Sequence, residues 1–159
     1  MCAILDNSTR DEVFGNAPTD RGRHFYEWIN QGQGRLAIGG TKLREELGGS
    51  TQQPGSVNFR RWLPTAIRRG LVTQPDDDEA VNEAASDLEA RGICQSDDAH
   101  VLALAQDTGA RLLYSNDDAL RTDFTNRTII DGVRGKIYPT TDYREFLNDR
   151  RNRRLCSRR

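Results

Sequence analysis

The stretch between residues 96 and 118 constrains the fold more than any other part of the chain. Residues 99–105, AHVLALA, are almost entirely apolar and predict a buried helix that begins after Asp98 and ends at Gly109. Residues 111–114, RLLY, then predict a short buried strand, which delivers further acidic residues at its carboxyl end. A helix that leads within a few residues into a buried strand is typical of α/β proteins, in which helices cover a parallel sheet.

The same alternation of apolar strands and amphipathic helices recurs along the chain. We expect further strands at residues 2–5, 35–38, 128–130 and 136–138. Helices are expected from residue 19 or 20 through Ile29, at residues 42–47, around residues 58–69, from Val81 to a stop at Gly92, and from residue 141 or 142 through Leu147. Residues 119–124 are expected to form a short helix or a turn. Pro64 should kink or divide the third of these helices. This alternation predicts a three-layer α/β/α sandwich with a central, mostly parallel sheet.

The chain of 159 residues has the length of a single domain. We place this domain at residues 1–148. Residues 149–159 are rich in arginine and poor in apolar residues, so we expect them to form a basic, mobile tail. Such a tail would either bind RNA or an acidic partner, or serve only to keep the protein in solution.

The charge and cysteine content narrow the range of functions. The 23 Lys and Arg residues nearly balance the 24 Asp and Glu residues, so any binding of nucleic acid must depend on local patches. Three cysteines without metal-ligand spacing favour reduced thiols in a cytosol-like compartment. No apolar run approaches the roughly 20 residues of a membrane span, and no signal-peptide pattern follows Met1. We therefore expect a cytoplasmic protein without membrane contact.

Acidic residues stand close behind two of the predicted buried strands. Asp6 follows the first strand, and Asp117 follows the strand that comes after Gly109. In open parallel sheets, binding sites form beyond the carboxyl ends of the strands, so these two carboxylates should meet at one edge. Asp98 and Glu46 can join them from the first turns of helices that begin near the same edge.

A cluster of four carboxylates requires a cation, because the acids would otherwise repel one another and any anionic substrate. Hard oxygen ligands suit Mg²⁺ or Mn²⁺, which also bind the phosphate oxygens of a substrate. Such an ion lowers the pKa of a bound water and stabilises a leaving oxygen. The pattern therefore predicts metal-assisted hydrolysis of phosphodiester bonds.

The order of these acids along the chain resembles the PIN domain. The resemblance is carried by ILD at residues 4–6, LREEL at residues 43–47, Asp98 with its alanine-rich helix, and LLYSND at residues 112–117. It spans residues 1–147 and implies an α/β/α sandwich with Mg²⁺- or Mn²⁺-dependent ribonuclease activity, often as the toxin of a bacterial toxin–antitoxin pair. By this resemblance the catalytic acids are Asp6, Glu46, Asp98 and Asp117, the metal ligands among them are Asp6, Asp98 and Asp117, and Ser115 orients them.

Two of the acidic positions have competing neighbours. Glu45 competes with Glu46, and the leucines on either side favour Glu46. Asp97 competes with Asp98, and the spacing to the apolar helix favours Asp98. Asp118 is either an additional ligand or a cap for the helix that follows it.

RNA is the expected substrate and partner. Lys42, Arg60 and Arg61 are the residues that we expect to contact its phosphates. The resemblance also implies a protein antitoxin and a homodimer as partners. His24 and His100 lack the partner pattern of an acid–base site, so we expect neither to be catalytic.

Two other classes of protein fit the sequence less well. A phosphatase of the haloacid-dehalogenase type expects a second aspartate two residues after the first, where this chain has Ser8. A PIN-like module without catalytic activity would bind RNA or protein through Arg60, Arg61 and the basic tail. All four acidic positions are filled, which favours the enzyme over this module. Cys94 has no histidine and acid pattern around it and is not expected to be a nucleophile.

Overall fold

The computed structural model describes residues 2–154, which contain a five-stranded sheet. Its strands are β1 (Cys2–Leu5), β2 (Arg35–Ala37), β3 (Val72–Thr73), β4 (Leu112–Tyr114) and β5 (Lys136–Ile137), in the spatial order β3-β2-β1-β4-β5. All four pairings between neighbouring strands are parallel. β1 lies at the centre with all four residues buried, which explains its uninterrupted apolar sequence.

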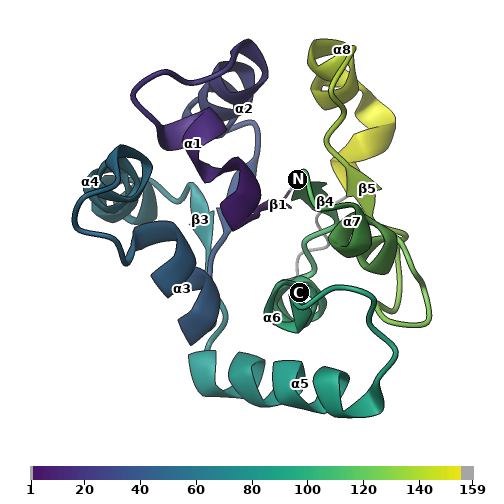
Figure 1. Cartoon of the computed structure of the whole chain (residues 1–159). Helices are drawn as coiled ribbons and strands as arrows, with labels where there is room; N and C mark the ends of the chain where they lie inside the picture. The colour runs from purple at the N-terminus through teal and green to yellow at the C-terminus, as the bar shows by residue number, and fades with distance from the viewer. Residues whose placement is uncertain (1, 155–159) are drawn as a thin grey trace.

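Helices cover both faces of this sheet in the described part of the chain. They are η1 (Asn7–Thr9), α1 (Arg10–Phe14), α2 (Asp20–Asn30), α3 (Thr41–Gly48), α4 (Pro54–Arg68), α5 (Asp78–Arg91), α6 (Ala99–Thr108), α7 (Asp118–Phe124), α8 (Tyr143–Asn148) and η2 (Arg150–Arg154). Figure 1 shows α1, α2 and α8 on one side of the sheet and α5 and α6 on the other. The predicted three-layer α/β/α sandwich is therefore confirmed. None of these helices combines the length and the apolar character that a membrane span requires.

The predicted helix and strand around Gly109 form as expected. Residues 99–105 of α6 are all buried, which explains why this helix has no polar face over its first two turns. Gly109 ends α6 in the left-handed conformation, with φ of 75°, which glycine adopts without strain. The chain then enters β4 within three residues, next to β1.

The sheet differs from the predicted one in two places. Residues 128–130 form a turn and not a strand, because the N–H groups of Ile129 and Ile130 both bond to the carbonyl oxygen of Asn126. Both isoleucines are buried in this turn, so their apolar character reflects burial without strand pairing. β3 was absent from the predicted strands, since two residues are too few to produce a periodic pattern.

Two helical segments also differ from expectation. η1 and α1 occupy residues 7–14, for which the sequence predicts no helix. α4 begins at Pro54, in the first helical turn, where the missing N–H of proline costs nothing. It continues through Pro64 without division, so of the two expected effects of this proline, a kink or a division, the division does not occur.

The residues after α8 pack against the domain as far as the structure describes them. Asn152, in η2, is buried, accepts a hydrogen bond from Lys136 Nζ at 2.5 Å and donates one to the carbonyl oxygen of Phe146 at 2.8 Å. The prediction of a mobile tail is therefore wrong for its beginning. Residues 155–159 lie outside the described residues.

The cysteines differ in part from the expected reduced thiols. Cys2 is disulfide-bonded, whereas Cys94 is a free thiol. Burial and the nearby carboxylate of Asp123 raise the pKa of Cys94. Because a thiol with a raised pKa is a weak nucleophile at neutral pH, this agrees with the expectation that Cys94 has no catalytic role.

Candidate metal centre

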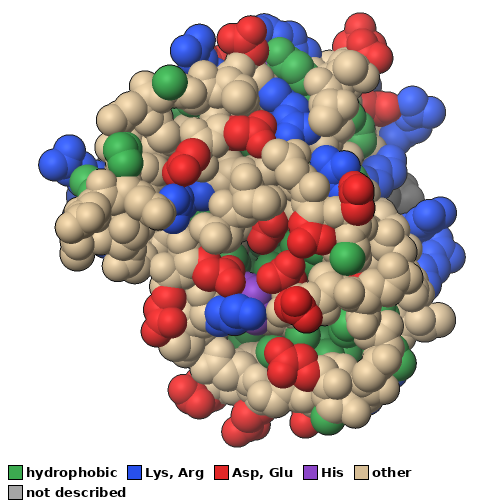
Figure 2. All heavy atoms as spheres, in the orientation of Figure 1, with side chains coloured by type: hydrophobic (Ala, Val, Ile, Leu, Met, Phe, Trp, Pro, Cys, Tyr) green, Lys and Arg blue, Asp and Glu red, His purple; other side chains and the backbone are tan. Residues whose placement is uncertain are grey.

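The carboxyl ends of β1 and β4 place Asp6 beside Ser115. The register pairs Leu5 with Tyr114, and the N–H of Asp6 donates to the carbonyl oxygen of Tyr114 at 3.0 Å. The residues that follow these two strands therefore lie side by side at one edge of the sheet. Figure 2 shows acidic side chains gathered near the middle of one face of the molecule, with a histidine visible among them.

Asp6 is a buried carboxylate with one oxygen held by hydroxyl groups. It is only 4% exposed, and its Oδ2 accepts hydrogen bonds from Ser8 Oγ at 2.6 Å and from Ser115 Oγ at 2.8 Å. Such charge-assisted hydrogen bonds hold a carboxylate in a defined orientation. Among residues 2–154 no hydrogen bond to Oδ1 is found, so this oxygen is available to bind a cation.

Ser115 links Asp6 to Asp117. Its fully buried hydroxyl donates to Asp6 and accepts the backbone N–H of Asp117 at 3.0 Å. Asp117 in turn caps α7, since its Oδ1 accepts the N–H of Leu120 at 2.9 Å. One serine therefore connects two acids from different strand ends through its hydroxyl.

Asp98 lies directly before α6 and makes no capping hydrogen bond with its side chain. Its carboxylate is therefore not engaged by the helix end. Burial, together with the negative charges of Asp6, Glu46 and Asp117, raises the pKa of Asp98, while His100 acts in the opposite direction. The four acids thus share one electrostatic environment, and we refer to them below as the acidic cluster.

Asp123, on α7, fixes the loop that leads to Asp98. It is 1% exposed and accepts hydrogen bonds from the N–H of Gln95 at 3.0 Å and from the N–H and hydroxyl of Ser96 at 2.8 Å. This loop has no regular structure, so these bonds define its path. Because α7 begins directly after Asp117, one short helix helps to position two acids of the cluster.

A pair of contacts to Asp78 attaches α3 to the start of α5. The N–H of Gly40 donates to Asp78 Oδ1 at 2.9 Å, and the guanidinium of Arg44 donates to Oδ2 at 2.8 Å. Although burial disfavours the charged form of Asp78, these donors lower its pKa. Asp77 caps α5 by accepting the N–H of Glu79 at 2.9 Å. These two aspartates therefore have the structural role that their position before a helix predicts.

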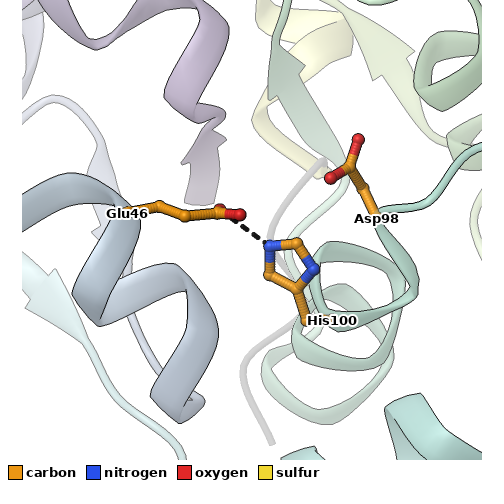
Figure 3. Close-up of side chains that lie close together, drawn as sticks. All are labelled: Glu46, Asp98 and His100. Carbon is orange, nitrogen blue, oxygen red and sulfur yellow. Dashed lines mark hydrogen bonds and ion pairs between the residues drawn. The ribbon is translucent and has the colours of Figure 1, made fainter.

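Glu46 contributes the fourth acid of the cluster from α3. It lies in the second turn of this helix, not in the first turn as expected. Its Oε2 lies 2.9 Å from Nε2 of His100, and Figure 3 shows Glu46 extending from α3 toward this ring. Ligand atoms of Glu46, Asp98 and His100 all lie within 4.8 Å of one another.

The structure separates the competing acids by their exposure. Glu45 and Asp97 are exposed, whereas their neighbours Glu46 and Asp98 are partly buried within the cluster. Asp118 is 96% exposed and pairs with a surface arginine at 3.5 Å. The geometry therefore favours Glu46 and Asp98 as the acids that could bind a metal.

The three basic residues predicted to contact RNA lie on two different helices. Lys42 is exposed on α3, and its Nζ donates to the carbonyl oxygen of Asp97 at 3.4 Å, next to the acidic cluster. Arg60 donates to two backbone carbonyl oxygens in the connection between α3 and α4. Arg61 is exposed and lines a groove on α4 with Trp62. Lys42 is thus the basic residue placed beside the acids.

A buried polar network supports the chain at Asn116, between two residues of the site. Arg21 donates to Asn116 Oδ1 at 3.0 Å and to Glu12 Oε1 at 3.3 Å, and it packs 4.5 Å from the ring centre of Tyr114. Burial and the hydrogen bond to Glu12 raise the pKa of Tyr114 to about 12. The phenol therefore stays protonated and donates to Glu12 at 2.9 Å. The sequence pattern does not reveal this network, because its members come from distant segments.

His100 contacts Glu46, and Asp123 holds the loop before Asp98, although the sequence predicted no site role for either residue. A count of residues along a continuous helix would put His100 on a different face from Asp98. Asp98 has non-helical backbone angles, with φ of −107° and ψ of 40°, so this count does not apply. The signal that could have identified His100 is its position two residues after Asp98, in the first turn of the helix that Asp98 precedes.

No protein-family model, curated protein or solved structure matches this chain. The residues of the acidic cluster fit a hard divalent cation by their chemistry. Their carboxylate oxygens are the preferred ligands of Mg²⁺ and Mn²⁺. Burial, and after it the repulsion of the neighbouring acids, raises the pKa of Asp98, and a bound cation would offset that repulsion.

Proposed function

We propose that this protein is a Mg²⁺- or Mn²⁺-dependent endoribonuclease that hydrolyses RNA phosphodiester bonds at the acidic cluster. The observations that support the proposal are the grouping of Glu46 and Asp98 with His100, within 4.8 Å of one another, and the hydrogen bonds of Ser115 to Asp6 and Asp117 at adjacent strand ends. Asp6, Asp98 and Asp117 are the proposed metal ligands, and Glu46 is the fourth acid of the site. The PIN-domain resemblance of the sequence supports the same residues.

The charges of the site favour an anionic substrate only in the presence of a cation. When bound, a divalent ion would supply positive charge for the phosphate and lower the pKa of a water molecule. Ser115 would keep Asp6 and Asp117 in the orientation that binding requires, through the two hydrogen bonds of its hydroxyl. Lys42 is placed beside the cluster and would contact a phosphate of the RNA.

The biological role that we propose is that of a toxin in a toxin–antitoxin pair, as the resemblance implies. A protein antitoxin and a second copy of this chain are accordingly the proposed protein partners. A small DNA-binding protein encoded next to this one would support this role.

Cleavage of RNA by the purified chain tests the proposed activity. We expect labelled single-stranded RNA of random sequence to be cut with Mn²⁺ or Mg²⁺, and not in the presence of a chelator. Asp98→Asn should lower the rate by about 100-fold or more, because it removes a charged ligand. Asp97→Asn, at the exposed neighbouring position, is the matched control and should leave the rate unchanged. An Asp98→Asn variant that cleaves as fast as the parent would overturn the proposal, and metal binding without cleavage would favour a binding module.

A further inference from the structure

His100 is the one nitrogen donor in the described part of the metal centre. It is the second residue of α6 and only 5% exposed, so its ring is held within the protein. Its Nε2 lies 2.9 Å from Oε2 of Glu46, and Figure 3 shows the two side chains directed toward each other. This nitrogen can either bind a metal ion together with the acids or donate a hydrogen bond to Glu46.

The second nitrogen of the ring distinguishes these two roles. Nδ1 of His100 is buried, and no group in residues 2–154 forms a hydrogen bond with it. If Nε2 bound a metal, the ring proton would lie on Nδ1, where no acceptor is found. Histidines that bind metals almost always donate this other N–H to a carboxylate, a carbonyl oxygen or water. If the proton lies on Nε2 instead, Nδ1 carries no hydrogen and is only an acceptor, so no buried N–H is left without a partner.

We infer that His100 is a positioning residue, which donates its Nε2–H to Glu46 and holds this carboxylate toward the acidic cluster. The cation of the proposed nuclease would then be bound by oxygen atoms only. An all-oxygen set favours Mg²⁺ and Mn²⁺, whereas an imidazole ligand would shift the preference toward Zn²⁺ and similar ions. This inference rests on the proposed function, since it assigns a role at the same site.

Titration of the full-length chain with Mn²⁺ by calorimetry tests this role with two substitutions. His100→Leu removes the donor at similar volume and should weaken Mn²⁺ binding by about 10- to 100-fold. His100→Gln places an amide N–H near the position of Nε2 and should bind Mn²⁺ within about threefold of the parent. His24→Gln changes the other histidine, which packs against Tyr143, and should bind as the parent does. Thermal unfolding of each variant with a chelator controls for loss of the fold.

Pulsed electron paramagnetic resonance of the Mn²⁺-loaded parent gives a second readout, independent of activity. We expect no coupling to a coordinated imidazole nitrogen. A coupling that disappears in His100→Gln, together with a loss of affinity as large as in His100→Leu, would make His100 a ligand and overturn the inference. Unchanged Mn²⁺ affinity in His100→Leu would also overturn it. If the parent binds no Mn²⁺, the proposed function fails, and the inference fails with it.

Discussion

The hydroxyl of Ser115, at the end of β4, donates a hydrogen bond of 2.8 Å to Oδ2 of Asp6, at the end of β1. Oγ of Ser115 also accepts a hydrogen bond from the N–H of Asp117. Strand pairing brings these residues to the same edge, but the hydroxyl determines how the two acids face each other. The geometry of the candidate site thus depends on one small side chain at least as much as on the acids themselves.

Replacement of Ser115 by alanine should therefore weaken metal binding more than it weakens the fold. Asp6 would retain the hydrogen bond from Ser8 but lose the one that links it to Asp117. We expect the dissociation constant for Mn²⁺ to rise by about 10-fold or more, as is usual when a group that orients a ligand is removed. Ser86→Ala, at an exposed position on α5, is the matched control. Equal affinities for Mn²⁺ in the two variants would contradict this role of Ser115.

Asp123 should contribute mainly to stability. Asp123→Ala leaves the N–H groups of Gln95 and Ser96 without their acceptor, so we expect the free energy of unfolding to fall by about 2–3 kcal/mol. Urea denaturation measures this change. Asp118→Ala, on the same helix but exposed, should change it by less than about 0.5 kcal/mol. Comparable losses in both variants would show that the loop does not depend on Asp123.

Asp98 should destabilise the metal-free protein at neutral pH. Burial and neighbouring acids raise its pKa in the folded state, so the stability of the parent falls as the pH rises from the unfolded value of 3.8 through the folded value. Asp98→Asn removes this cost and should raise the melting temperature at pH 7 in the presence of a chelator. The gain should disappear below pH 3.8, where both states are protonated.

Addition of Mn²⁺ should reverse the order of the melting temperatures of the parent and Asp98→Asn, because a ligand stabilises only the state that binds it. The parent should then melt above Asp98→Asn at pH 7. Asp97→Asn, which is exposed, serves as the control in both conditions. A melting temperature for Asp98→Asn below that of the parent in chelator would argue against repulsion within the cluster.

The contact between Asp78 and α3 should depend on pH in the opposite direction. Burial disfavours its charge, but the donors Arg44 and Gly40 lower its pKa, so its contribution is present above the unfolded value of 3.8 and is lost as the pH falls through the folded value. Asp78→Asn should lower the free energy of unfolding at pH 7 by about 1 kcal/mol, a modest value because the side chain is 36% exposed. Urea denaturation at pH 7 and near pH 2 measures the difference, which should vanish at the lower pH. A loss of equal size at both values would contradict the electrostatic explanation.

Much of the fold could be predicted from the sequence because buried segments consist mostly of apolar residues. β1, β4 and the first seven residues of α6 are buried, so each has an apolar sequence, interrupted only by His100 in α6. The same reasoning fails at residues 128–130, since a buried turn and a buried strand share the same composition. It also fails for β3, because two residues are too few to show the pattern of a strand.

The candidate site was predictable where it follows from strand ends. Asp6 and Asp117 lie where the rule for parallel sheets places them, beside each other through Ser115. The leucines on either side of the two glutamates already favour Glu46, and the structure leaves Glu45 exposed and Glu46 partly buried. Asp123 could not be distinguished by sequence from an exposed aspartate, because the N–H groups that donate to it lie in a distant and irregular loop.

Location of manganese by anomalous X-ray scattering from crystals grown with Mn²⁺ tests the central claim most directly. We predict an anomalous peak at the carboxyl end of β1 and β4, roughly 2.0–2.6 Å from carboxylate oxygens of Asp6, Asp98 and Asp117. The peak should be lost in crystals of Asp98→Asn. Saturating Mn²⁺ that produces no peak among these three residues, or the same peak in both proteins, would contradict the account.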